Sequence, residues 1–376
     1  MVCTSLVPSF PPSRALARYA VVALAVMAVG VVVELTLGVK GAGRTSPVLE
    51  AWPFLDMWVR WDAGWYEQIA AREYTFSATE QSAAAYFPVY PLLMRGFIAL
   101  GLNVFLAGIV VTWLAGAAAA VTFSRWAVTL KPEAASLATW LLLAWPFSFF
   151  LFGAVYSDAV FLLLMTSAFL LMERGRWGWA TVVGAVATAT RPIAPAVVLG
   201  LVARHIERRR TAGEPWGVKD AVPLASGAGL AAFMGFLWWR FGDPLAFATT
   251  QVGWGQLSGP EAWLKYGALK KFAPLDLTFP AFHAALAFLC LWLAWRMRTT
   301  LGCGYALYVG AAVGIPLLSS RDFIGLGRYA LAGFPVFLQL ALELPAKPRR
   351  TAAWLVVSAV LLGWMTSRFA MGFYTS

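Results

Sequence analysis

Long apolar runs alternate with short polar segments along most of the chain. A helix needs about 20 apolar residues to cross the hydrocarbon core of a bilayer, where every backbone N–H and C=O must find a partner within the protein. The runs are continuous rather than alternating in polarity, which favours helices over the strands of a membrane barrel. We therefore expect an all-α, polytopic membrane protein with about nine spanning helices. The expected spans are 19–37, 104–123, 134–151, 159–172, 221–239, 281–295, 301–318, 329–344 and 352–368.

Two further apolar runs, 177–190 and 193–203, are too short to span comfortably, and Arg191 lies between them. We expect a pair of short helices that meet near the outer half of the membrane, because non-helical backbone persists at that depth only where protein or a water-filled cavity lines it. A charge at membrane depth is costly and is usually functional or paired. Arg191 is therefore either a ligand-binding residue or one half of a structural ion pair, with Asp158 as a candidate partner.

Two long polar intervals are expected on the outer side. The first, 38–87, contains four tryptophans and is far longer than an ordinary helix connection. Loops of that length are usually functional or disordered, and the aromatic content argues against disorder. We expect short, non-spanning helices in it. The second interval, 241–280, contains Trp254 and Trp263. Neither interval marks a domain boundary, so residues 1–376 are expected to form one membrane domain.

Composition and charge agree with this topology. Of the 376 residues, 60% are hydrophobic and 12% are charged, against about a quarter charged in a soluble domain. The net charge of +11 comes from short Lys and Arg clusters between apolar runs, as the positive-inside bias predicts, and this pattern argues against nucleic-acid binding. It places the N-terminus in the cytoplasm, with a retained signal anchor, and leaves 12 of the 18 acidic residues outside. Carboxylate chemistry is therefore expected on the extracytoplasmic side.

The cysteines and histidines do not suggest a metal centre. Cys3, Cys290 and Cys303 lie at the terminus or in apolar segments, without the spacing of a zinc site or a disulfide framework. His205 and His283 are too few and too far apart for a histidine-based centre. We expect neither a metal nor a cofactor.

Acidic, basic and aromatic residues crowd into Arg60–Tyr66, within the first outer interval. Asp62 has two interpretations. As the residue before a helix that begins at Ala63, it could cap that helix through its carboxylate. Alternatively, Trp61, Trp65 and Tyr66 could partly desolvate the carboxylate and so raise its pKa toward that of a useful general base. The aromatic faces could then receive a sugar ring or a lipid chain, although such residues also gather at membrane interfaces as a simple belt.

Several arginines on the outer side are candidates for binding phosphate. Arg60, Arg321 and Arg328 could equally contact lipid headgroups. Arg321 and Arg328 flank Gly325-x-Gly327, where backbone can approach a ligand closely while guanidinium groups hold a phosphate.

These residues together resemble the PIG-V-like (GPI mannosyltransferase 2 type) branch of the GT-C glycosyltransferases. The resemblance runs from about residue 55 to residue 335, in the order that is found in the family. Two positions depart mildly from its pattern: Glu73 stands where Gly is commoner before Tyr74, and Asp158 replaces a frequent Glu. The matching pieces are 60–66 with Ile69, Ala70 and Tyr74, then 86–91, 146–150 with 156–158, 190–192, Ser320 with Arg321, Arg328 with Tyr329, and Phe334 with Pro335.

The resemblance implies a GT-C-like bundle and a mannosyltransferase that works on the non-cytoplasmic side. Its donor would be a polyprenyl-phosphate sugar, typically dolichyl-phosphate mannose, and Asp62 would be the catalytic residue. In the eukaryotic members the acceptor is the GPI precursor. The short loops suggest a bacterial member in the cell membrane, whose lipid-linked acceptor need not be a GPI lipid.

We expect direct displacement at the anomeric carbon with inversion, in which Asp62 accepts the proton of the acceptor hydroxyl. Arg191, Arg321 or Arg328 would stabilise the departing phosphate. The rival interpretations are a transporter or flippase of lipids or sugar-lipids, and a non-catalytic subunit of a glycosylation complex. The expected partners are the donor, the acceptor and membrane lipids. The expected substrate-binding residues are Arg60, Trp61, Trp65, Tyr66, Tyr86, Phe87, Tyr90, Asp158, Arg191, Arg321, Asp322, Arg328 and Tyr329.

Overall fold

The computed structural model describes residues 11–43, 48–256, 259–265, 278–344 and 348–375. These residues form helices, turns and bends without a strand, which confirms the all-α expectation. Five of the described helices are long and apolar enough to cross a membrane, as in a helical membrane protein. The expected number of about nine spans is not confirmed. The five are α1 (Pro12–Leu37), α4 (Val104–Leu130), the continuous η4 and α9 (Val218–Gly227, Ala228–Phe241), α13 (Thr278–Thr300) and α17 (Pro348–Ala370).

Prolines shorten two of the helices that were expected to span. The run 134–151 forms α5 (Pro132–Leu143), after which Pro146 prevents a straight continuation and the chain turns through η3 (Ser148–Leu151). The run 329–344 is likewise divided before Pro335. It forms α15 (Leu326–Ala332) and α16 (Pro335–Glu343).

The helix break around Arg191 is where the sequence predicts it, between α7 (Trp177–Thr188) and α8 (Ala194–Ala212). Only α7 is short, however. Helix α8 continues through the basic cluster 204–210 and ends at Ala212. Gly213, directly after it, adopts a left-handed conformation with φ 65°. The prediction of two short helices is therefore wrong for α8.

The first outer interval contains the expected short helices, and the described residues of the second contain three more. Those of the first interval are η1 (Pro53–Trp58), α2 (Ala63–Ala71) and η2 (Ala83–Ala85), with α3 (Val89–Ala99) directly after it. Those of the second are α10 (Ala246–Thr249), η5 (Thr250–Trp254) and α11 (Pro260–Trp263). Residues 266–277 of that interval lie outside the described residues.

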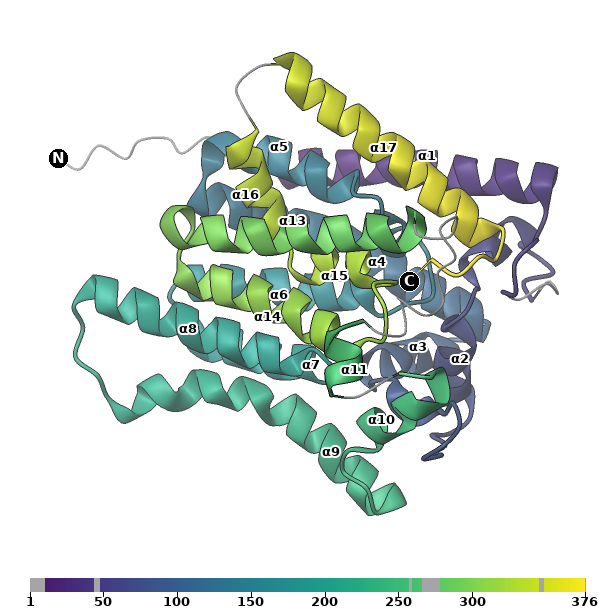
Figure 1. The fold of residues 1–376 in the computed structure, drawn as a ribbon, viewed down its shortest axis with the longest axis horizontal. Coiled ribbons are helices and arrows are strands. Elements are labelled where there is room, and N and C mark those ends of the chain that lie inside the picture. Colours follow the sequence, from purple (N-terminus) through teal and green to yellow (C-terminus); the bar gives the residue numbers. More distant parts are fainter. Residues whose placement is uncertain (1–10, 44–47, 257–258, 266–277, 345–347, 376) are drawn as a thin grey trace.

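The longer helices pack side by side as a bundle. The most extensive packing joins α4 to α6 (Asp158–Glu173), and α14 (Cys303–Ser319) to both α8 and α13. Figure 1 shows α1 and α17 along one side of this bundle and α9 along the other. Helices α2, α3, α10 and α11 gather at one end, where the C-terminus also lies. Segments that are distant in sequence thereby meet at this end.

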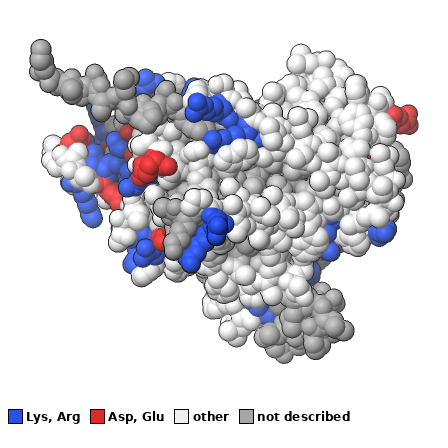
Figure 2. All heavy atoms as spheres, turned by 90° about the horizontal axis from the view of Figure 1, so that it is seen from above, with Lys and Arg blue, Asp and Glu red and all other residues white. Residues whose placement is uncertain are grey.

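Charge is distributed unevenly over the surface. Figure 2 shows Lys and Arg gathered toward the end at which α1 begins, the left in both views, beside a broad surface without charged side chains. An uncharged band of this kind suits contact with lipid.

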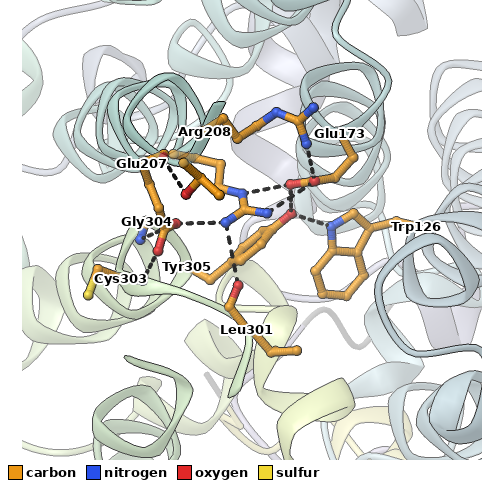
Figure 3. A network of polar contacts seen from close by, with 10 residues as sticks. Trp126, Glu173, Glu207, Arg208, Leu301, Cys303, Gly304 and Tyr305 are labelled. Atoms are coloured by element: carbon orange, nitrogen blue, oxygen red, sulfur yellow. Dashed lines mark hydrogen bonds and ion pairs between the residues drawn. The ribbon is translucent and has the colours of Figure 1, made fainter. Parts of the chain in front are cut away.

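A buried ionic network lies at the end of α6 that is remote from Asp158. The carboxylate of Glu173 accepts from Arg204 (2.7 Å) and Arg208 (2.6 Å) of α8 and from the Tyr305 hydroxyl (2.6 Å) of α14. Trp126 of α4 donates to the Tyr305 oxygen at 2.8 Å. The network therefore links four helices (Figure 3).

Candidate active site

Asp62 occupies the position directly before α2, but its side chain does not cap that helix. The reason is its backbone conformation: φ −61° and ψ −17° are helical, whereas a capping residue is usually extended. The carboxylate instead receives a hydrogen bond from the Tyr86 hydroxyl at 3.2 Å and lies 3.8 Å from Nη1 of Arg328. The capping interpretation of Asp62 is thus wrong for its side chain, and the carboxylate is 23% exposed.

Trp61 holds the backbone before Asp62 in an unusual conformation, with φ 51°. A left-handed conformation costs a residue with a side chain roughly 1–2 kcal/mol, so surrounding contacts must maintain it. The Trp61 indole donates to the Phe373 carbonyl at 3.2 Å, and its ring meets the ring of Tyr374 edge-on at 5.1 Å. The segment after α17 therefore supports the backbone beside Asp62. A cavity of about 180 Å³ lies here, lined by Ala42, Gly43, Val59–Trp61, Ala63 and Gly64.

Arg328 extends from the start of α15 toward two carboxylates. Its Nη1 lies 3.8 Å from Asp62, and its Nε lies 3.7 Å from Asp158, distances that allow charge attraction but exceed those of hydrogen bonds. The guanidinium also packs over the rings of Phe150 and Tyr156. Nε and Nη1 are buried and find no hydrogen-bond acceptor among the described residues. A buried guanidinium with unfilled donors in a polar site is suited to receive an anionic ligand.

Arg191 forms the structural ion pair that was one of its two interpretations. Its guanidinium is paired with Asp158, and the two residues are only 4% and 2% exposed. It also packs over the ring of Tyr329 at 5.1 Å. Because Asp158 faces both Arg191 and Arg328, this pair fixes one of the two carboxylates between which Arg328 lies.

The electrostatics of the outer-loop groups favour a proton-accepting Asp62. Burial raises the pKa of the Asp62 carboxyl, while Arg328 and the hydrogen bond from Tyr86 act in the opposite direction. Burial, and then the Asp62 charge, also hold the pKa of Tyr86 well above its ordinary value. Tyr86 therefore remains a hydrogen-bond donor to Asp62.

Aromatic rings line one side of Asp62. The rings of Trp65 and Tyr86 stack at 5.9 Å, and Trp254 of the second outer interval contacts them at 5.7 and 6.1 Å. Tyr66 donates to Ser157 at 3.1 Å and packs edge-on against Tyr90. We name Trp65, Tyr86 and Trp254 the aromatic wall.

Four other expected binding residues lie apart from Asp62 or support the framework. Phe87 packs with Phe233 and Phe247 in a separate hydrophobic cluster. Arg60 is 3% exposed and donates to Glu34 and to the Ala370 and Asp56 carbonyls, so it joins the first outer interval to α1 and α17. Arg321 and Asp322 pair with each other at 3.3 Å. The backbone N–H of Arg321 donates to the Gln256 side chain, which places Arg321 beside the segment that carries Trp254.

Three residues of the site are not among the expected binding residues. Trp254 and Tyr374 come from distant segments, and their part in the site depends on tertiary packing. Tyr156 lies in a noted motif, and its hydroxyl accepts from the Asp62 amide at 3.3 Å. Within the described ranges, no group of three or more His, Cys, Asp and Glu side chains could hold a metal ion. Comparison with family models and with curated proteins gave no match.

Proposed function

We propose that the chain is a glycosyltransferase that moves mannose, or a related hexose, from a polyprenyl-phosphate sugar to a lipid-linked hydroxyl on the extracytoplasmic side. The observation that carries this proposal is the arrangement of Asp62 and Arg328. A partly exposed carboxylate that caps no helix lies beside a guanidinium with two unfilled, buried donors. A proton acceptor next to a phosphate-binding cation is what displacement of a sugar from a phosphate requires.

Charge is conserved in the proposed step. The acceptor oxygen forms a bond to the anomeric carbon while the bond from that carbon to the phosphate oxygen breaks, with inversion. The hydroxyl proton passes to Asp62, which becomes neutral, and the lipid phosphate gains the negative charge that Asp62 loses. Arg328 faces both changes, because it lies 3.8 Å from Asp62 and its free donors can follow the growing charge on the phosphate.

The aromatic wall supports recognition of a sugar. Sugar rings present apolar C–H faces that pack against aromatic side chains. The rings of Trp65, Tyr86 and Trp254 contact one another, and the Tyr86 hydroxyl donates a hydrogen bond to Asp62, so the aromatic wall adjoins the Asp62 carboxylate. The Arg321 side chain, 34% exposed, is available to a phosphate or a headgroup.

The test uses the full chain reconstituted in vesicles with labelled polyprenyl-phosphate mannose and a lipid extract as the source of acceptor. We expect label to appear in a new glycolipid. Arg328→Gln should reduce that transfer about 100-fold or more. Arg72→Gln is the control, since the Arg72 side chain is 73% exposed and pairs with Glu67. Movement of labelled lipid between leaflets without transfer would favour a transporter and overturn the proposal.

A further inference from the structure

His283 of α13 makes an unusual pair of contacts with the turn that precedes Arg328. Its side chain is completely buried, and its Nδ1 accepts hydrogen bonds from the backbone N–H groups of Gly325 and Gly327, both at 3.2 Å. These groups belong to the first turn of α15, whose amides cannot be satisfied within the helix. Gly325 occupies the capping position but has no side chain with which to cap. His283 therefore caps α15 from another helix.

This arrangement determines which nitrogen of His283 carries its proton. A nitrogen that accepts from two N–H groups cannot itself carry hydrogen, so the neutral imidazole must be protonated at Nε2. That nitrogen is buried and has no acceptor in the described part of the chain. The rings of Phe147, Phe279 and Phe282 surround the imidazole at 5.0, 4.6 and 6.0 Å. The polar contacts of the His283 ring in these apolar surroundings are therefore the two hydrogen bonds that Nδ1 accepts.

The turn that His283 caps has little freedom to move. Gly325 has φ 92°, a conformation that suits glycine. A Cβ on Gly327 would lie 2.2 Å from the Phe147 ring. The Gly327 carbonyl accepts from the Trp145 indole at 3.1 Å, so His283 and Trp145 hold the same residue through its N–H and its C=O. The next residue is Arg328.

We infer that His283 is a positioning residue, which sets the place of the Arg328 guanidinium between Asp62 and Asp158. This inference rests on the proposed function, because it assigns His283 an effect on transfer through Arg328. The imidazole itself contacts the Gly325–Gly327 backbone. Its loss would leave two buried N–H groups without an acceptor and would release the turn.

Two substitutions separate the acceptor from the shape of the side chain. The asparagine of His283→Asn carries its Oδ1 one bond from Cγ, as Nδ1 is in histidine, whereas the leucine of His283→Leu has a methyl group there. We expect His283→Leu to reduce the transfer rate about tenfold or more, and His283→Asn to retain most of it. In an Arg328→Gln background His283→Leu should have little further effect, because residues that act through one another are not additive.

Hydrogen exchange of the 323–331 backbone tests the inference without relying on transfer. We expect faster exchange there in His283→Leu than in the parent, and near-parental exchange in His283→Asn. If the parent transfers no sugar but exchange follows this order, the proposed function fails and the capping role stands. If His283→Leu lowers transfer equally with and without Arg328, or leaves exchange at 323–331 unchanged, the positioning role is wrong.

Discussion

The Asp62 carboxylate lies 3.8 Å from Nη1 of Arg328, although the two residues stand near opposite ends of the sequence. The contact exists because α2 and α15 both begin at the end of the bundle where α2, α3, α10 and α11 gather. Asp62 directly follows Trp61, whose backbone has an unusual φ of 51°. Arg328 directly follows the constrained turn Gly325–Gly327. Rigid backbone on both sides suits a site that must hold reacting groups in place.

The pH dependence of transfer should report the ionisation of Asp62. Burial raises the pKa of this carboxyl above its ordinary 3.8, whereas Arg328 lowers it. A general base acts in its deprotonated form, so the transfer rate should rise with pH through the pKa of Asp62 and then level off. In Arg328→Gln the guanidinium no longer lowers the pKa of Asp62, so burial raises that pKa further and the increase in transfer rate should occur at higher pH. Rate profiles of the two proteins test this, and an identical midpoint would count against the contact.

The same shift affects stability with a defined sign. Between pH 3.8 and the raised pKa of Asp62, the folded protein binds more protons at this site than the unfolded chain, so stability falls as the pH rises. Asp62→Asn should remove this part of the pH dependence. Melting temperatures across that range, for the parent and for Asp62→Asn, measure this contribution. Parallel curves would contradict the raised pKa of Asp62.

Gly327→Ala tests the constraint on the Arg328 turn. The added Cβ would lie 2.2 Å from the Phe147 ring, so we expect a loss of about 1–3 kcal/mol in unfolding free energy and reduced transfer. Gly314→Ala is the matched control, because a Cβ there meets nothing within 4 Å and the residue is helical. Thermal unfolding and transfer assays on both variants test whether the turn is constrained at Gly327. Equal unfolding free energies and equal transfer rates of Gly327→Ala and Gly314→Ala would show that the turn tolerates displacement.

The ionic network around Glu173 should affect stability and not chemistry. Glu173→Gln removes the buried carboxylate that Arg204, 12% exposed, and Arg208, 37% exposed, share. Loss of one member of a fully buried ion pair costs about 3–5 kcal/mol, and the partial exposure of the two arginines places the expected loss below that range. We expect a lower melting temperature and an unchanged transfer rate per folded molecule, since the network lies at the end of α6 remote from Asp158. Glu343→Gln, at the more exposed pair with Arg296, should have a smaller effect. An equal effect of the two would contradict the structural role of Glu173.

Local features of the fold could be predicted from the sequence. The start of a helix at Ala63, the break around Arg191 and the all-helical class all follow from short-range patterns. The expected number of about nine spans is not confirmed. Pro146 and Pro335 shorten or divide two of the apolar runs on which that number rests.

The site could be predicted only in part, for a similar reason. Asp62 and Arg328 were candidates, but the sequence could not choose among three arginines. Folding pairs Arg191 with Asp158, directs Arg321 toward Asp322 and Gln256, and brings Arg328 to Asp62. In the sequence, His283 suggests at most a metal ligand. Its capping of α15 depends on how α13 packs, which no short-range pattern encodes.

The most direct test of the account is the single-turnover transfer rate of Asp62→Asn in reconstituted vesicles. Asparagine keeps the shape of the side chain but cannot take the acceptor proton, so we expect the rate to fall about 100-fold or more while labelled donor still binds. Glu67→Gln, which removes another carboxylate from α2, should transfer at the parental rate. Transfer by Asp62→Asn at the rate of the parent would contradict the role of Asp62 as the base.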